Sequence, residues 1–236
     1  MRYLELTFLD PARNLACDEA LLDACESGSA EAFLRIWEPV THFVVAGYSN
    51  KSAAEVDLSA CASAGIPVLR RFTGGGTVLQ GPGCLNYTVV FEHAALRTVS
   101  DAFAFVLRRH QSCLARLLGL LPTIEGSSDL AVGGRKISGN AQHRKRRFTL
   151  VHGTFLLNLD FSLMEALLPP PSREPEYRRR RSHSEFLMNL EIPAADLKRA
   201  LRQSWEAEAN GPSIPEDTIE RLVAGRYARA DWNFKF

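Results

Sequence analysis

The sequence predicts an α+β protein built around a mixed or mainly antiparallel sheet. Strand-like segments dominate the first half of the chain, helical patterns occupy the last fifth, and glycine-containing turn signals separate the strands. The length of 236 residues and the hydrophobic content of 46% are typical of a globular protein with a sizeable core. We therefore expect a single domain over residues 1–236.

The expected elements follow in order along the chain. Residues 1–10 are strand-like, and Leu15, Leu22 and Cys25 share one stripe of an expected helix. Ser100 is expected to cap a long helix. The expected helices cover Asn14–Cys25, Ser100 to about Leu120, and segments from Ala194 and from Pro215; the expected strands cover Phe33–Trp37, Phe43–Ala46, Ile66–Leu69, Tyr87–Phe91, two segments flanking Gly133-Gly134, and Leu150–Leu157; a loop is expected from Pro169–Pro171 to Arg178–Arg181.

Composition narrows the function classes. The net charge of +1 gives no sign of a strongly charged partner, and no aromatic residues interleave the basic runs, so nucleic acid is not an expected partner. Five cysteines, at positions 17, 25, 61, 84 and 113, form no C-x-x-C pair, which favours a reducing cytosol. No apolar run approaches the ~20 residues that span a bilayer. We expect a cytoplasmic protein with neither a signal peptide nor a membrane partner.

The strongest motif is the segment from Arg70 to Val78, which contains Gly74-Gly75-Gly76. Three consecutive glycines allow backbone N–H groups to approach an anionic ligand, and Arg70 and Arg71 add forked donors. A flexible hairpin loop with solvated arginines is an equal alternative for the glycines alone. A P-loop is excluded because no Gly-Lys-Ser/Thr follows, and a dinucleotide fingerprint is excluded because strand-like residues follow.

Two further segments carry candidate site residues. Lys136 lies between Gly134 and Gly139 on an expected strand, where a fixed ammonium would stabilise developing negative charge. His152 precedes Gly153 on an apolar strand. Taken singly, an exposed hairpin lysine and a structural histidine are the more common interpretations.

Together, these motifs resemble the lipoate–protein ligase family. The resemblance is carried by Arg70–Gly76, Ser128-Asp129-Leu130, Arg135–Ala141 and His152–Leu157, and it extends to Asn14–Leu22, Arg35–Pro39 and Tyr227–Asn233. It implies the mixed sheet with packed helices that biotin protein ligases and class II aminoacyl-tRNA synthetases share. It also implies two half-reactions, in which ATP activates lipoate or octanoate as an acyl adenylate and a lysine of a lipoyl carrier domain then accepts the acyl group.

The resemblance also implies roles for individual residues. Lys136 would hold the carboxylate and bridging oxygen of the adenylate, Asp129 would help to hold Mg²⁺, and His152 would support the site. The expected substrate- and adenylate-binding residues are Arg70, Arg71, Thr73, Gly74, Gly75, Gly76, Thr77, Asn86, Ser138, Gly139, Asn140, Ala141, His152, Gly153 and Thr154. The expected partners are a carrier domain with an acidic surface and, because the chain stops at Phe236, a separately encoded accessory subunit.

Two alternatives depart from this scheme. An ATP-independent octanoyltransferase would take its acyl group from an acyl carrier protein through a cysteine thioester, and Cys84 is the candidate thiol, although an inert buried thiol is the more common state. A non-catalytic acyl or lipoyl binder would explain why Leu79-Gln80 replaces the family's His-Asp pair. The basic runs Arg144–Arg147 and Arg178–Arg181 have three interpretations: solvated loops, a surface for an acidic carrier, or a loop that closes on adenylate phosphates.

Overall fold

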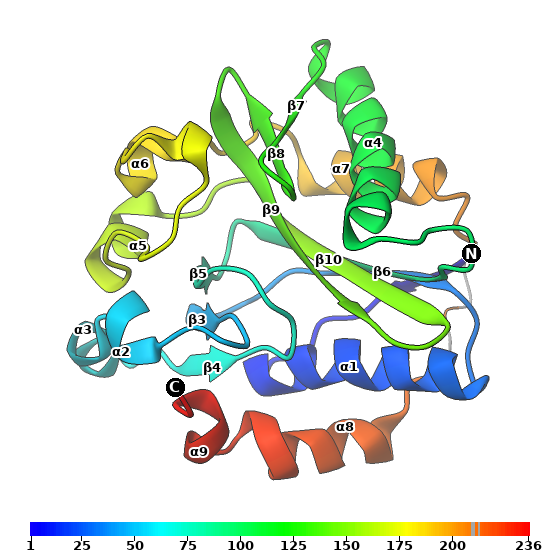
Figure 1. Ribbon diagram of the computed structural model, residues 1–236, viewed down its shortest axis with the longest axis horizontal. Helices are drawn as coiled ribbons and strands as arrows, with labels where there is room; N and C mark the ends of the chain where they lie inside the picture. The colour runs from blue at the N-terminus through cyan, green and yellow to red at the C-terminus, as the bar shows by residue number, and fades with distance from the viewer. Residues whose placement is uncertain (209–210, 212) are drawn as a thin grey trace.

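A seven-stranded mixed sheet forms the centre of the computed structural model, which describes residues 1–208, 211 and 213–236 (Figure 1). Its strand order is β1-β2-β6-β10-β9-β8-β7. The strands are β1 (Arg2–Glu5), β2 (Phe33–Trp37), β6 (Cys84–Glu92), β7 (Thr123–Glu125), β8 (Asp129–Val132), β9 (Arg135–Arg144) and β10 (Phe148–Leu156). β1 and β2 pair in parallel and the other neighbours are antiparallel, which confirms the expected α+β class.

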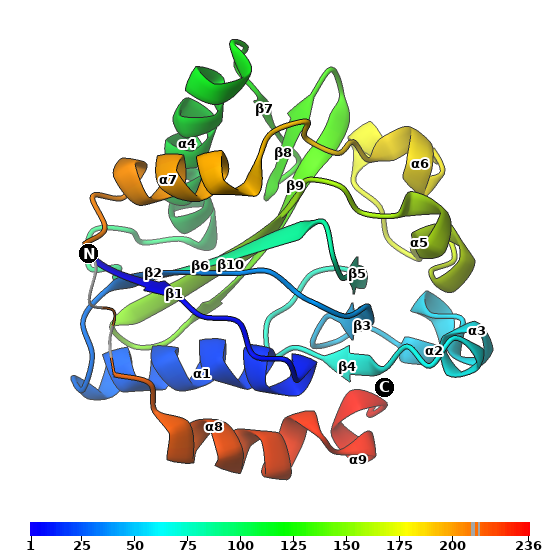
Figure 2. The same cartoon turned by 180° about the vertical axis from the view of Figure 1, so that it is seen from behind.

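Helices cover both faces of this sheet (Figure 2). α4 (Val99–Leu118) and α7 (Ala194–Ser204) lie on one face, and α1 (Pro11–Ser27) and α8 (Glu216–Leu222) lie on the other. Because successive side chains of a strand point to opposite faces, Val89 packs in the core under α4 whereas Val90 packs in the core under α1. Val151 and Leu150 of the neighbouring strand divide between the two cores in the same way.

A second, three-stranded sheet lies beside the large one and has the order β4-β3-β5 (Figure 1). Its strands are β3 (Phe43–Ala46), β4 (Val68–Arg70) and β5 (Val78–Gln80), so the glycine-rich segment is the connection from β4 to β5. Four short helices lie on this side of the molecule: α2 (Ser52–Glu55), α3 (Leu58–Ser63), α5 (Phe161–Leu167) and α6 (His183–Phe186). The sequence patterns had not predicted these helices or β5 and β7.

Local sequence explains where the long helices begin and end. The Asp10 carboxylate accepts from the N–H of Ala12, Pro11 occupies the first turn of α1, and Gly28 ends this helix with φ 83°. The expected cap of α4 was wrong: Thr98, not Ser100, caps this helix, and the Asp101 carboxylate accepts from the N–H of Thr98 in return.

The C-terminal segment returns to the start of the glycine-rich loop. After α8 come a π-helical turn, η2 (Val223–Tyr227), and α9 (Ala230–Asn233). The Tyr227 hydroxyl donates to Glu19 of α1 at 2.6 Å, and the Asn233 side-chain oxygen accepts from the N–H of Arg70 at 3.0 Å. The C-terminal segment therefore contacts α1 through η2 and β4 through α9. Among the described residues, no helix has the length and apolar content needed to cross a membrane.

Candidate functional site

A pocket of about 340 Å³ lies where the two sheets meet. The glycine-rich loop, the middle of β9 and β10, the loop before β8 and the segment 171–186 form its walls. Its lining residues are Leu15, Asp18, Trp37, Val45, Arg71, Gly75, Gly76, Thr77, Val78, Gln80, Asn86, Tyr87, Gly126, Ser127, Ser128, Asp129, Lys136, Gly139, Asn140, Ala141, His152, Gly153, Thr154, Pro171, Arg173, Pro175, Arg178, His183 and Phe186.

Lys136 reaches the pocket because β9 contains a bulge. Leu130 pairs with Ser138 and Ala131 pairs with Lys136, so Ile137 has no partner on β8. A bulge of this kind places two successive side chains on one face of the sheet, and both Ile137 and Ser138 are fully buried. The bulge therefore turns Lys136 to the face of Asp129, where the ammonium lies 2.9 Å from the carboxylate.

Gly139 provides the space in which this lysine lies. A Cβ at Gly139 would lie 2.7 Å from both Cε and Nζ of Lys136, closer than real contacts allow. The Lys136 side chain is 24% exposed, so its ammonium is both paired and accessible from the pocket. A lysine in this state can exchange its carboxylate partner for an anionic ligand.

Asp129 is already paired through both of its oxygens. Oδ1 faces Lys136, and Oδ2 accepts from the Tyr177 hydroxyl at 2.8 Å. Burial and the charge of Asp129 raise the pKa of Tyr177 above its ordinary value, so the hydroxyl stays protonated and donates. Within residues 1–208, 211 and 213–236, no three acidic, histidine or cysteine side chains gather as a metal site. Mg²⁺ would therefore have one protein carboxylate here and would need phosphate oxygens for most of its coordination.

Asn140 connects the central strands to the loop before β8. Its side-chain oxygen accepts from the Tyr87 hydroxyl at 2.6 Å, and its amide donates to the carbonyl of Ser128 at 2.6 Å. Gly153 lies opposite Asn140 in the β9–β10 pairing, and a Cβ there would lie 1.8 Å from the Asn140 oxygen. The glycine after His152 is thus required by the neighbouring asparagine.

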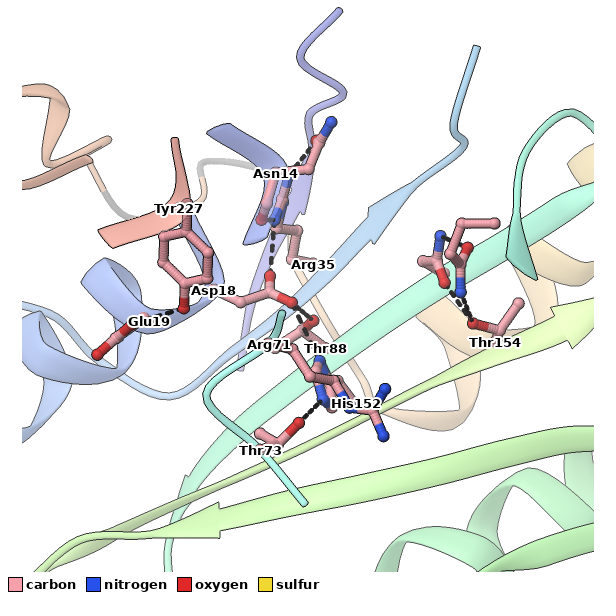
Figure 3. Close-up of polar contacts among 12 residues, drawn as sticks. Asn14, Asp18, Glu19, Arg35, Arg71, Thr73, Thr88, His152, Thr154 and Tyr227 are labelled. Carbon is pink, nitrogen blue, oxygen red and sulfur yellow. Dashed lines mark hydrogen bonds and ion pairs between the residues drawn. The ribbon is translucent and has the colours of Figure 1, made fainter. Parts of the chain in front are cut away.

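A buried polar chain runs beneath the glycine-rich loop (Figure 3). Thr73 Oγ1 lies 2.8 Å from His152 Nε2, and His152 Nδ1 lies 3.3 Å from Asp18 Oδ2. The Arg35 guanidinium, fully buried, donates to Asp18 Oδ1 at 2.6 Å, and Thr88 donates to Oδ2 at 2.8 Å. Burial alone would raise the pKa of Asp18, but the Arg35 charge, followed by His152 and Thr88, outweighs burial and lowers it. His152 therefore positions the loop through Thr73.

A second polar group lies where β5 meets β6 and β10. The Gln80 amide donates to Thr154 Oγ1 at 2.7 Å, Thr154 donates to Asn86 Oδ1 at 2.5 Å, and the Asn86 amide donates to the Gln80 oxygen at 2.9 Å. Each of the three side chains thus hydrogen-bonds to the other two. Together they join the small sheet to the large one across the pocket wall.

The two arginines before the glycines have different positions. Arg71 lines the pocket and donates to the carbonyls of Gly74 at 2.6 Å and Gly76 at 2.8 Å, which fixes the shape of the loop. Burial, followed by the charge of Arg70, lowers the pKa of Arg71 to about 10. Arg70 is fully buried and does not line the pocket.

Arg70 therefore corrects the sequence expectation. Its guanidinium donates to the carbonyls of Gly47, Tyr48, Asn50, Trp232 and Asn233 and to the Ser52 hydroxyl. All of these partners lie in the segment after β3 and in the last helix. Arg70 thus holds the C-terminal segment against the small sheet and is not among the residues that line the pocket.

Part of the pocket wall is apolar. Leu15, Trp37 and Val45 line it and belong to the core under α1, and Val78, which also lines the pocket, packs against that core. The indole N–H of Trp37 is buried and has no hydrogen-bond partner among the described residues. This part of the wall offers an aliphatic chain an apolar surface, while Lys136 and Arg71 offer its charged end cations.

The described residues that line the pocket include no thiol. All five cysteines are buried, and none is among the described residues that line the pocket. Cys84 begins β6 with 1% exposure, and burial raises the pKa of its thiol to about 12. A thiol in this state is protonated and inert at neutral pH.

Most of the residues expected from the sequence come together at the pocket, although their roles remain predictions. Four do not line it: Arg70, Thr73, Gly74 and Ser138. Thr73 acts through His152, and the bulge turns Ser138 to the other face. Sequence reasoning missed Asp18, Trp37, Gln80 and Tyr87 as site residues, although Asp18 and Trp37 belong to segments that carried the family resemblance.

Comparisons with known proteins identify the family. Residues 10–205 match the family described as "Lipoyl protein ligase A/B catalytic domain". The chain is 30% identical to octanoyltransferase LipM of Geobacillus kaustophilus over 277 aligned positions, which cover 99% of this chain and 98% of that protein. It is 36% identical to a putative lipoate-protein ligase A of Aeropyrum pernix over 168 residues, 71% of this chain and 61% of that protein.

The fold agrees with the sequence match. A solved structure of lipoate-protein ligase A bound with ATP superposes with a TM-score of 0.84 at 24% identity and covers 99% of this chain and 98% of that chain. With its mixed sheet, its packed helices and a family match over most of its length, this chain belongs to the lipoyl protein ligase A/B catalytic domain family, whose members are lipoate–protein ligases and octanoyltransferases.

Proposed function

We propose that this chain is an ATP-dependent lipoate–protein ligase, which activates lipoate or octanoate as an acyl adenylate and transfers the acyl group to a carrier-domain lysine. The observation that carries this proposal is a pocket with an accessible lysine and no thiol among its described lining residues. Acyl transfer from an adenylate needs positioning and charge stabilisation but no enzyme nucleophile.

The proposed activation step uses the charged side of the pocket. A carboxylate oxygen of the acid attacks the α-phosphorus of ATP, and pyrophosphate leaves. Lys136 exchanges Asp129 for the anionic carboxylate, and its fixed charge stabilises the negative charge that the phosphorus centre gains. The shape of the glycine-rich loop, which Arg71 maintains, lets the acid and the adenylate approach the backbone. Mg²⁺ would be held by Asp129 and phosphate oxygens and would neutralise phosphate charge.

The proposed transfer step consumes the adenylate. The neutral amine of the carrier lysine attacks the acyl carbon, the C–O bond to the phosphate breaks, AMP leaves with the electron pair, and the nitrogen releases a proton to solvent. Because AMP is a stable anion, the protein need only hold the acyl carbon at the mouth of the pocket and exclude water. The apolar part of the pocket wall, with Leu15, Trp37 and Val45, would hold the acyl chain.

The second candidate function is octanoyl transfer without ATP, which the names of full-length relatives favour. That reaction would require a thiol that forms an acyl thioester, and Cys84 is buried with a raised pKa. The alignment with the transferase of Geobacillus kaustophilus is longer than this chain, so that protein has insertions that this chain lacks. The pocket thus supports the ligase better than the transferase.

Exchange of pyrophosphate into ATP, dependent on lipoate or octanoate, tests the proposal. Wild-type protein should exchange label, and Lys136→Ala should lose exchange by on the order of a hundredfold or more while it unfolds at the same denaturant concentration. Lys145→Ala is the matched control. Lys145 lies on the β9–β10 turn, does not line the pocket, and pairs with Asp23 of α1. Unchanged exchange in Lys136→Ala would exclude the proposed role of this lysine.

A donor experiment separates the two candidates. Octanoyl-loaded acyl carrier protein and a lipoyl carrier domain are incubated without ATP, with wild-type protein and with Cys84→Ala. The ligase proposal predicts no acylation above the rate of the uncatalysed reaction. Acylation that needs no ATP and disappears in Cys84→Ala would establish the transferase instead.

A further inference from the structure

The arginine run that precedes α6 divides into an inward and an outward pair. Arg178 is 5% exposed, its guanidinium lies 4.9 Å from the Phe186 ring centroid, and its Nε donates to the carbonyl of Arg181 at 3.0 Å. Arg181 donates to the carbonyls of Gly134 and Tyr177, each at 2.9 Å. Arg179 and Arg180 are exposed, and neither guanidinium has a hydrogen-bond or ion-pair partner among the described residues.

The backbone conformation of this outward pair is energetically unfavourable. Arg179 has φ 54° and ψ 41°, and Arg180 has φ 58°, so two successive residues with side chains adopt the left-handed conformation. Glu174 supports the turn, because its carboxylate accepts from the N–H of Arg180 at 2.9 Å and lies 3.5 Å from Arg178 Nε. Unfavourable backbone of this kind concentrates at functional positions, where surrounding contacts maintain it.

The outward pair belongs to the segment 171–186, which forms one wall of the pocket. Arg178 and His183, on either side of the pair in the sequence, line the pocket, whereas Arg179 and Arg180 do not. We therefore do not expect this pair to bind a phosphate inside the pocket. An acceptor lysine on another protein must enter past the pocket walls, so the exposed side of this wall is where we expect that protein to dock.

The other basic run offers no such surface. On the β9–β10 turn, Lys145 pairs with Asp23, Arg147 lies 3.2 Å from Glu92, and Arg146 lies 3.9 Å from Glu26. These acidic partners offset the charge of the turn. The positive charge of Arg179 and Arg180 is not offset in this way and remains available to an acidic partner.

We propose that Arg179 and Arg180 form the docking site for an acidic surface of the carrier domain that accepts the acyl group. This inference rests on the proposed function for the identity of the partner, and it applies whichever acyl donor the chain uses. Charges at an interface rim act mainly on association and its salt dependence. Their loss should therefore weaken carrier binding and leave chemistry inside the pocket intact.

Binding of a purified lipoyl carrier domain, measured by fluorescence anisotropy without any acyl donor, tests the docking site directly. Replacing both residues together (Arg179→Glu with Arg180→Glu) should raise the Kd at low salt by on the order of tenfold or more, and high salt should reduce the difference between variant and wild type. Arg146→Glu is the matched control, because this side chain is 86% exposed in the other basic run, and it should bind as wild type does.

Acyl transfer distinguishes this inference from the proposed function. The double variant should show wild-type pyrophosphate exchange, with the same KM for ATP, and a raised KM for the carrier domain alone. A raised KM for ATP with unchanged carrier binding would overturn the docking site and assign the pair to phosphate. Equal carrier binding by the double variant and wild type would also overturn it, even if wild type is an active ligase. If wild type binds the carrier domain through Arg179 and Arg180 but shows no pyrophosphate exchange, only the proposed function is overturned.

Discussion

Gly139→Ala tests whether the position of the Lys136 ammonium determines activity. The new Cβ would lie 2.7 Å from Cε and Nζ of Lys136, whereas non-bonded carbon atoms normally lie about 3.5–4.0 Å apart. The ammonium must therefore move by roughly 1 Å, and its 2.9 Å contact with Asp129 lengthens or breaks. The clashing atoms are the free end of a flexible side chain, so the backbone of β9 need not move.

The expected result is a folded protein with low activity. Gly139 does not have a positive φ, and the Lys136–Asp129 pair is partly exposed, so the free energy of unfolding should change by no more than about 1 kcal/mol. A displacement of about 1 Å in a positioned group can reduce turnover by roughly a hundredfold. Urea titration measures the first quantity, and pyrophosphate exchange measures the second.

Gly225→Ala is the matched control for this substitution. Gly225 lies in η2 and does not line the pocket, a Cβ there would meet no atom within 4 Å, and its φ is not positive. We expect near wild-type exchange from this variant. If Gly139→Ala folds and also keeps wild-type exchange, the position of Lys136 over Gly139 does not matter, and the argument from the bulge is refuted.

Three predictions concern the stability of the scaffold. Asp18→Asn leaves the buried Arg35 charge unpaired and should lower the free energy of unfolding by about 3–5 kcal/mol. Asp196→Asn, in an exposed ion pair, should lower it by only about 0–1 kcal/mol, and equal losses of the two variants in urea titration would refute this prediction. Burial lowers the pKa of His110 to about 3, so stability should fall as the pH drops from about 6.5 toward 3, and an equal fall in His110→Gln would contradict the assignment. Gly153→Ala should destabilise by about 1–3 kcal/mol, because its Cβ meets a side-chain oxygen at 1.8 Å and a backbone oxygen at 2.8 Å; an unchanged thermal midpoint would exclude that clash.

Local patterns predicted the elements that local interactions form. The strand-like segments Phe33–Trp37 and Leu150–Leu157 match β2 and β10 to within two residues, and the helical stripe of Asn14–Cys25 lies inside α1. The short elements were missed because so few residues carry no clear period: β5 and β7 have three residues each, and α2 and α6 have four. The early boundary of α4 was missed because Thr98 and Ser100 are both good capping residues, and the reciprocal hydrogen bonds between Thr98 and Asp101 favour Thr98.

The sequence motifs identified most of the pocket residues, but they did not predict on which face of a strand each side chain lies. Arg70 and Arg71 are adjacent at the end of β4, so their side chains point to opposite sides, and only Arg71 reaches the pocket. Lys136 reaches it only because a bulge shifts the register, which no sequence pattern announces. Asp18 joins the site through His152, from 134 residues away in the sequence, and such a contact exists only in the folded chain.

The proposed ligase transfers its acyl group from an activated adenylate and uses no enzyme thiol. Synthetic octanoyl adenylate and octanoyl-loaded acyl carrier protein, supplied in separate reactions with the same carrier domain and no ATP, distinguish this route from a thioester route. Wild type and Cys84→Ala should acylate the carrier from the adenylate at equal rates, and neither should use the thioester. Transfer from the thioester alone, lost in Cys84→Ala, would refute the ligase proposal.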